Sequence, residues 1–417
     1  MTKKSFPRPN KKEEAGIAVL VLCGAVLGVM VAKILFAAAD RSSSFGEYLA
    51  ALAGLAVLTA AALYLQIILH EGGHLVCGLL SGYRFVSFRI GSWMLQKENG
   101  KLCLHRYTLA GTGGQCLLAP PEMTNGKMPY QLYNLGGVLM NLFTAVLAAG
   151  LMWACREAWP ARIFFEMLCV AGLGSALTNG IPLRIQGVAN DGANARDLGK
   201  DPAALRAFWV QLSINAKQAE CVALREMPEE WFALPTEGLD NIMVAVQAVL
   251  HANRLMDQQR FAETAQVIDA LEAQKTAVLP LHRNLLLCDR LTCALLTGED
   301  AAPWLKRWNR KEMRNFRKQM KTFPSVLRTE YAAALLAEKA PARAETYPCP
   351  VCTAGEELPV CRRNRQRMRT DGAAGTDVLD GINETGPFSG RRRGLRFAFT
   401  ASVPGWGSCR WHRCSAR

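Results

Sequence analysis

The chain has 417 residues, of which 50% are hydrophobic, and its formal net charge at pH 7 is +14. The apolar residues are concentrated in long blocks, which argues against an ordinary water-soluble core. Part of the positive charge flanks these blocks and part lies in the carboxy-terminal stretch, so membrane topology explains it better than nucleic-acid binding. The 14 cysteines fall mostly in predicted membrane or cytoplasmic segments, where thiols stay reduced, so no disulfide framework is expected.

Four blocks reach the length of about 20 apolar residues that a bilayer-spanning helix needs. They are Gly16 to Ala39, Tyr48 to Leu80, Leu132 to Ala154 and Ile163 to Ile181. The alternative is a set of buried helices in a soluble protein, but lengths this apolar rarely occur together in soluble folds. The first block lacks a clear small-residue cleavage site, so residues 1–47 are predicted to hold a retained membrane anchor.

The positions of Lys and Arg near the ends of the blocks predict the orientation in the membrane. They place the amino terminus, the loop from Ser81 to Tyr130 and everything after Ile181 in the cytoplasm. The short loops at 40–47 and 155–162 then lie outside. The sequence therefore predicts a multi-pass integral membrane protein, in contact with membrane lipid, whose amino and carboxyl termini are both cytoplasmic.

The second block ends in His70-Glu71-Gly72-Gly73-His74, a His-Glu-x-x-His motif. On a helix the two histidines lie one turn apart on the same face, so two imidazole nitrogens can bind one Zn²⁺ ion. Glu71 would then lie beside the open coordination position as a general base. An accidental match on an ordinary helix is the alternative, but ionisable residues at the end of an apolar span are costly unless they serve a site.

Residues 82–122 predict a cytoplasmic β-hairpin, because Phe85 to Ile90 and Lys101 to Tyr107 alternate in polarity and a turn sequence separates them. His105 in the second strand is a weaker candidate ligand, since a lone strand histidine is more often structural. The glycine-rich stretch 110–116 forms either a flexible turn or a strand that lies close to another peptide.

Two polar residues accompany the third and fourth blocks. Asn141 is a buried amide that needs a partner, either a neighbouring helix or a substrate carbonyl. Asp191 follows just past the cytoplasmic end of the fourth block. His70 is expected at a similar depth, because it follows some twenty residues of inward-running helix. Asp191 can then supply a third zinc ligand and leave the fourth position to water, unless it only caps a helix or forms an Asx-turn.

Together these motifs resemble the site-2 protease family of intramembrane zinc metallopeptidases. The family has His-Glu-x-x-His on one span, a Gly-Pro-x-x-Asn-like element on the next core span, and Asn-x-x-Pro followed by Asp-Gly on the last. The resemblance implies that Glu71 is the base and that Asn141 helps to hold the substrate or the oxyanion. The implied zinc ligands are His70, His74 and Asp191.

The resemblance covers roughly residues 48–195, the predicted metalloprotease core. Gly113-Gly114 is similar to the membrane-associated β-loop with which the family guides its substrate strand. Two features of the sequence depart from the family pattern. Val138 replaces the usual proline, and the gap between Pro182 and Asp191 is longer than expected. They leave the histidines unaffected but bear on substrate positioning and on Asp191.

The remainder of the chain divides into two parts. Residues 196–345 are more polar and mostly helical in pattern, and 252–265 has the spacing of a tetratricopeptide-like hairpin. A helical cytoplasmic domain is predicted there, with a cytoplasmic protein partner as a hypothesis. Residues 346–417 contain no lysine and twelve arginines, and we expect a disordered or non-native tail. Cys349-Pro350-Val351-Cys352 within it resembles half of a second zinc site, but the spacing fits no compact ribbon.

The sequence thus predicts an α-helical polytopic membrane protein with a short cytoplasmic β-hairpin and a helical cytoplasmic domain. The predicted function is zinc-dependent hydrolysis of a peptide bond in a transmembrane protein substrate, near the cytoplasmic face. The alternative is a non-catalytic membrane scaffold that binds partners through its helical domain. Glu71 favours the enzyme, since a scaffold has no need of a base.

Overall fold

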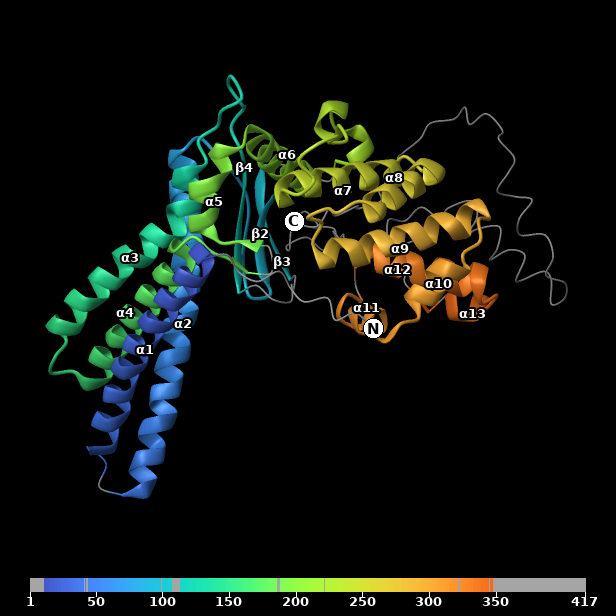
Figure 1. Ribbon diagram of the computed structural model, residues 1–417. Coiled ribbons are helices and arrows are strands. Elements are labelled where there is room, and N and C mark those ends of the chain that lie inside the picture. The colour runs from blue at the N-terminus through green and yellow to red at the C-terminus, as the bar shows by residue number, and fades with distance from the viewer. Residues whose placement is uncertain are drawn as a thin grey trace.

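The computed structural model describes residues 11–347, except 41, 43, 99, 107–112, 186, 187, 221, 322 and 345. Within these residues, four helices are long and apolar enough to cross a membrane, and they lie together at one end of the molecule (Figure 1). They are α1 (Lys11–Asp40), α2 (Phe45–Leu80), α3 (Gln131–Ala154) and α4 (Trp159–Gly180). The four predicted apolar blocks are therefore helices of spanning length.

Helix α2 is the element that carries the predicted motif, and it has 36 residues. A helix of this length extends about 54 Å, whereas the hydrocarbon core of a bilayer is about 30 Å thick. Its first turn is capped by Ser44, whose hydroxyl oxygen accepts a hydrogen bond from the backbone N–H of Glu47 at 3.2 Å. The motif lies near the opposite end of α2, about 38 Å along the helix from Phe45.

Helix α3 packs against both α2 and α4. Gly73 of α2 and Gly136 of α3 permit a close approach, because a Cβ atom on either would overlap the backbone of the other. Large apolar side chains also cover the outside of the bundle, among them Val21, Leu22, Phe36, Val57, Phe143 and Val146. The bundle is therefore apolar on its outer surface as well as inside, unlike the exterior of most soluble domains.

A four-stranded antiparallel sheet follows α2, in the order β3-β2-β1-β4. Its strands are β1 (Arg84–Ile90), β2 (Trp93–Glu98), β3 (Lys101–Arg106) and β4 (Gly114–Ala119). Glycines with positive φ, Gly91 at 56° and Gly100 at 82°, make the two tight connections between β1, β2 and β3. Strands β3 and β4 are the two edges of the sheet.

This sheet is larger than the predicted hairpin, and its pairing differs. The sequence prediction paired residues 85–90 with residues 101–107, but β2 lies between them and pairs with both β1 and β3. The expected hairpin leaves 93–98 outside its strands, although glycine turns bound this segment on both sides. The glycine-rich stretch also contains a strand, since β4 begins at Gly114 and pairs with β1. Residues 107–112 lie outside the described part.

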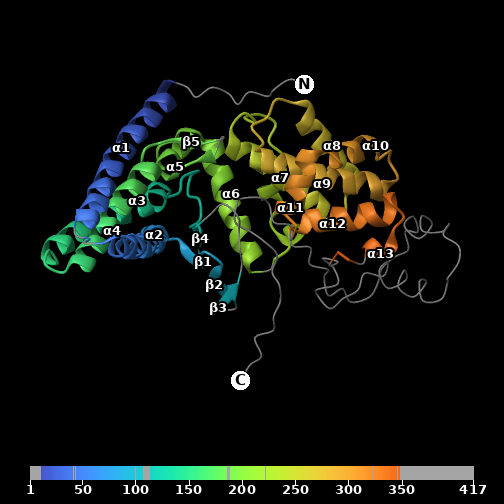
Figure 2. The same ribbon diagram turned by 90° about the horizontal axis from the view of Figure 1, so that it is seen from below.

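A short connection after α4 leads from the bundle to the sheet. It contains the two-residue strands β5 (Arg184–Ile185) and β6 (Val188–Ala189), which pair with each other, then α5 (Asp191–Asp197) and α6 (Pro202–Ala219). Helix α6 packs on the sheet, and Phe208 and Leu212 share one apolar cluster with Leu117 of β4. Trp209 donates a hydrogen bond to the carbonyl of Pro121 at 2.8 Å. Figure 2 shows α6 between the sheet and the remaining helices.

The remaining helices, α7 to α13, lie together beside the sheet and are called the helical unit below (Figure 2). They are α7 (Ile242–Asp257), α8 (Phe261–Ala273), α9 (Pro280–Thr297), α10 (Ala302–Trp308), α11 (Lys311–Gln319), α12 (Pro324–Ala332) and α13 (Pro341–Ala344). Four single-turn elements accompany them: the 3₁₀ helices η1 (Leu198–Lys200), η2 (Leu224–Glu226) and η3 (Glu229–Phe232), and the π-helical turn η4 (Ala333–Ala337). The helices at 196–345 agree with the helical pattern of the sequence.

The segment 252–265 covers the end of α7, a turn at Gln259 with a φ of 61°, and the start of α8. It is thus a helical hairpin, the shape that its tetratricopeptide-like spacing predicts. The predicted tail at 346–417 lies outside the described residues apart from Thr346 and Tyr347. Cys349 and Cys352 belong to the part that is not described.

Candidate metal centre

Three side chains from two distant segments meet at the end of the helical bundle. The Nε2 atoms of His70 and His74 are 3.3 Å apart, and each lies 3.4 Å from Oδ2 of Asp191. An ion that binds four ligands tetrahedrally at about 2.0–2.1 Å holds neighbouring donor atoms about 3.3–3.4 Å apart. The nearly equal sides of this triangle therefore match the spacing that one metal ion requires.

The carboxylate of Asp191 adds a second sign of a cation site. Its Oδ2 is buried and lies 3.4 Å from each imidazole Nε2, with no other hydrogen-bond partner within the described residues. A buried carboxylate oxygen in this position is well satisfied by a cation between the three atoms. Burial raises the pKa of Asp191, but the two imidazoles beside it lower that pKa to about 2. The group is therefore a carboxylate at neutral pH, as a metal ligand must be. The residues present fit a bound metal ion.

The backbone of α3 leaves room for the two imidazoles. A Cβ atom at Gly137 would overlap the rings of both His70 and His74. The rings themselves lie edge to face, with an interplanar angle of 86°. Glycine at this position of α3 thus lets the helix pass directly beside the metal-binding face of α2.

His74 has a defined tautomer because of its second ring nitrogen. Nδ1 lies 2.9 Å from the backbone carbonyl oxygen of Tyr133, and a carbonyl can only accept. Nδ1–H therefore donates to Tyr133, which leaves a lone pair on Nε2 facing Asp191. Carbonyl partners of this kind hold metal-binding histidines in orientation.

His70 contacts a chain of buried amides instead. Asn141 Nδ2 lies 2.9 Å from Nδ1 of His70, and Gln66 Nε2 donates to Asn141 Oδ1 at 2.6 Å. Thr144 lies at the other end of the chain, with its hydroxyl oxygen 3.3 Å from Gln66 Nε2. Asn141 is fully buried, at 0% exposure. In this structure it contacts a predicted metal ligand and does not line the cavity beside the site.

The side chain of Glu71 extends from α2 to strand β4 of the sheet. The backbone N–H of Cys116 in β4 donates a hydrogen bond to its carboxylate. Gly114 in the same strand approaches so closely that a Cβ atom there would overlap the Glu71 side chain. The predicted Gly113-Gly114 segment thus lies against the candidate base. The N–H group of Cys116 lies on the edge of β4 that faces away from β1, so it is available to Glu71.

Asn190 fixes the backbone just before Asp191, in the connection that follows the carboxy-terminal end of α4. Its Oδ1 accepts from the backbone N–H groups of Ala193 and Leu183, each at 3.0 Å. Its Nδ2 donates to the carbonyl oxygens of Thr178, at 2.8 Å, and Ile181. The helix-cap role that was the alternative for Asp191 therefore belongs to its neighbour. The long gap before Asp191 is accommodated by the β5–β6 pair.

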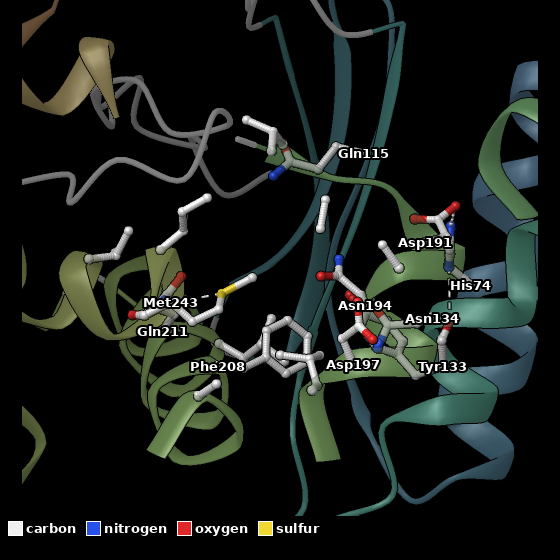
Figure 3. Close-up of a pocket in the computed structure, with 18 of the residues that line it drawn as sticks. His74, Gln115, Tyr133, Asn134, Asp191, Asn194, Asp197, Phe208, Gln211 and Met243 are labelled. Atoms are coloured by element: carbon white, nitrogen blue, oxygen red, sulfur yellow. Dashed lines mark hydrogen bonds and ion pairs between the residues drawn. The ribbon is translucent and has the colours of Figure 1, made fainter. Parts of the chain in front are cut away.

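A cavity of about 400 Å³ begins at the three predicted ligands and Glu71. It continues past β4 and α5 to α6 and α7, so that the bundle, the sheet and the helical unit all contribute to its wall (Figure 3). Apolar side chains on the α6–α7 side include Phe208, Leu212, Met243 and Val246. The candidate metal site is thus open on the side of the sheet and the helical unit.

The structure brings His70, His74, Asp191 and Glu71 together, whereas His105 lies on β3, at the opposite edge of the sheet from β4. Sequence reasoning missed Gln66 and Asn190. Gln66 had a detectable signal, because it is a polar residue inside an apolar block, four positions before His70 and on the same helix face. Asn190 was visible only as part of a turn sequence.

Comparison with models of known protein families, with curated proteins and with solved structures finds no match to this chain. The interpretation of the site therefore rests on its own geometry and chemistry.

Proposed function

We propose that the protein is an intramembrane zinc metalloprotease of the site-2 protease type. The observation that carries the proposal is the triangle of donor atoms, with sides of 3.3 and 3.4 Å, formed by His70, His74 and Asp191. Its sides match a tetrahedral ion, and three protein ligands leave a fourth position for water, as in catalytic zinc sites. A donor set of two imidazoles and one carboxylate suits zinc.

Glu71 is the residue that moves the proton. A bound zinc ion supplies a Lewis acid that makes water acidic enough to lose a proton near neutral pH. Glu71 accepts that proton and returns it to the leaving nitrogen of the peptide. The hydrogen bond from the Cys116 N–H holds the carboxylate in one position between the strand and the metal site. This contact, and the position of Glu71 in the same cavity as His70 and His74, support its role as the general base.

The proposed substrate is a transmembrane protein, cleaved near the cytoplasmic face. The outward apolar side chains of the bundle support contact with lipid, and the metal site lies near the end of α2, past most of its apolar length. A helical substrate hides its carbonyl groups in hydrogen bonds, so it must unwind before attack. An incoming strand that pairs with β4 at Cys116 must first displace Glu71 from that N–H group.

The test is Glu71→Gln, which keeps the size of the side chain but removes the proton acceptor. Zinc should remain bound, while cleavage of a reconstituted single-span substrate falls by roughly 10²- to 10⁴-fold. The matched control is Glu122→Gln, because Glu122 is an exposed carboxylate in the loop after β4. Cleavage and zinc content are measured in parallel, by gel electrophoresis and by metal analysis.

Cleavage at the wild-type rate in Glu71→Gln would remove the role assigned to this residue. A wild-type protein that binds zinc but cleaves no substrate would favour the scaffold function instead. Loss of zinc in Glu71→Gln would show that the substitution disturbs the site itself.

A further inference from the structure

Neutral amide side chains line the cavity, among them four from β4, α5 and α6. Gln115 comes from β4, Asn194 from α5, and Gln211 and Asn215 from α6. Figure 3 shows that Gln115, Asn194 and Gln211 come from three elements that surround the same space. These positions are far apart in the sequence, so only the packing of α6 on the sheet brings them together.

Three of these amides have unused hydrogen-bonding capacity. Within the described residues, the side chains of Gln115, Asn194 and Asn215 make no hydrogen bond, whereas Gln211 donates to the carbonyl of Met243 at 3.2 Å. Asn215 is only 3% exposed, and it lines the cavity. Its amide atoms are open to the cavity and are not sealed from it, so they can meet a ligand there. We call Gln115, Asn194, Gln211 and Asn215 the amide wall. It can bind a ligand that supplies both donors and acceptors.

Asp197, an acidic side chain that lines the cavity, is already paired with basic side chains. Asp197 is paired with Arg184 at 3.5 Å, with Arg196 at 2.8 Å and with Lys200 at 2.9 Å. Asp197 is therefore already satisfied, whereas Gln115, Asn194 and Asn215 keep free donors and acceptors among the described residues. An amide side chain both donates and accepts, which matches the alternating N–H and C=O groups of a peptide main chain. Phe208 and Met243 beside it offer apolar contacts for side chains.

We propose that this amide wall binds an extended peptide through main-chain hydrogen bonds. The peptide is the part of the substrate next to the scissile bond, on the side of the helical unit. This inference rests on the proposed protease function, because the cavity joins the wall to Glu71 and Asp191. It gives α6 a direct role in holding the substrate, with little selectivity for side chains.

The probe is a fluorescein-labelled decapeptide of alanine and serine, added to full-length Glu71→Gln protein so that it is not cut. Binding is measured by fluorescence anisotropy. The changes Gln115→Leu, Asn194→Leu and Asn215→Leu should each raise Kd roughly fivefold, the effect of one lost hydrogen bond. The matched control is Gln218→Leu, an amide further along α6 that does not line the cavity. It should leave Kd unchanged.

A second peptide, methylated on alternate main-chain nitrogens, separates main-chain from side-chain recognition. It should bind at least tenfold more weakly, since it lacks several donors. Equal affinity for both peptides, no binding of either, or wild-type Kd in all three leucine variants would overturn the proposal. Asn215→Leu removes a buried amide, so zinc content and thermal unfolding are checked. Gln115 and Asn194 are partly exposed and carry the test if that variant does not fold.

The same variants distinguish this inference from the protease function. If the wild type cleaves a substrate and the three variants keep its KM, the amide wall is wrong and the protease stands. If the variants weaken peptide binding in a protein that cleaves nothing, the peptide site stands and the protease is wrong.

Discussion

At the scale of single residues, the two histidines are held by different partners. His74 donates from Nδ1 to a backbone carbonyl, which leaves Nε2 free to bind a metal. For His70 to bind through Nε2, its Nδ1 must also carry the proton and donate to an acceptor. The amide of Asn141 supplies that acceptor when its oxygen faces His70, and Gln66 can then accept from the Asn141 nitrogen. An amide has both groups, so the contacts are kept in either direction.

We therefore expect Asn141 to position His70 for metal binding. Asn141→Leu should weaken zinc affinity roughly 10- to 100-fold, the usual effect of losing such a partner. Asn141→Asp keeps an acceptor and should retain most of the affinity. Competition with a zinc chelator measures both variants. Thr59→Val, which removes a hydroxyl that bonds only within α2, is the control. Equal affinity in Asn141→Leu and wild type would contradict the positioning role.

At the scale of secondary structure, the site depends on how closely α3 passes α2. Gly137 lies against both imidazoles, and the adjacent Gly136 meets Gly73 of α2. Any side chain at these contacts would move one helix or rotate the rings. Because a metal site needs its donors within a few tenths of an ångström, such a shift would open the triangle.

Gly137→Ala should accordingly reduce zinc affinity by at least roughly tenfold, since the new methyl group overlaps the ligand rings. The same change at Gly150, in the same helix, is the control, because a Cβ atom there meets nothing within 4 Å. Alanine favours helices over glycine, so neither change should weaken α3 itself. Isothermal titration with zinc gives both values. Equal affinities would show that the close approach is not needed for metal binding.

At the scale of the whole molecule, the helical unit and the sheet are joined through α6. Leu205, Phe208 and Leu212 belong to the same buried cluster as Val86 of β1 and Leu118 of β4. Gln96 of β2 also donates to the carbonyl of Ala219 at 2.9 Å. The sheet in turn supplies the strand that holds Glu71. Removal of α6 would therefore uncover the sheet next to the candidate site.

Two truncations of the full chain test this connection. A chain that ends at Tyr347 should keep membrane insertion and zinc content, because the composition of the removed residues, 348–417, does not favour folding. A chain that ends at Lys200 should lose zinc or become insoluble, because it exposes the apolar face of the sheet. Membrane fractionation and metal analysis report both outcomes. Unchanged zinc after truncation at Lys200 would show that α6 is dispensable for the site.

The sequence by itself determined the four apolar helices and the positions of His70, Glu71 and His74, because these depend on block length and on spacing within one helix turn. It also indicated Asp191 as a partner of the motif, on the basis of depth along the chain. Only the tertiary structure decided that Asp191 reaches both imidazoles and that Asn141 contacts His70. It alone also added β2 to the sheet and formed the amide wall. These features depend on contacts between distant segments, for which local periodicity carries no signal.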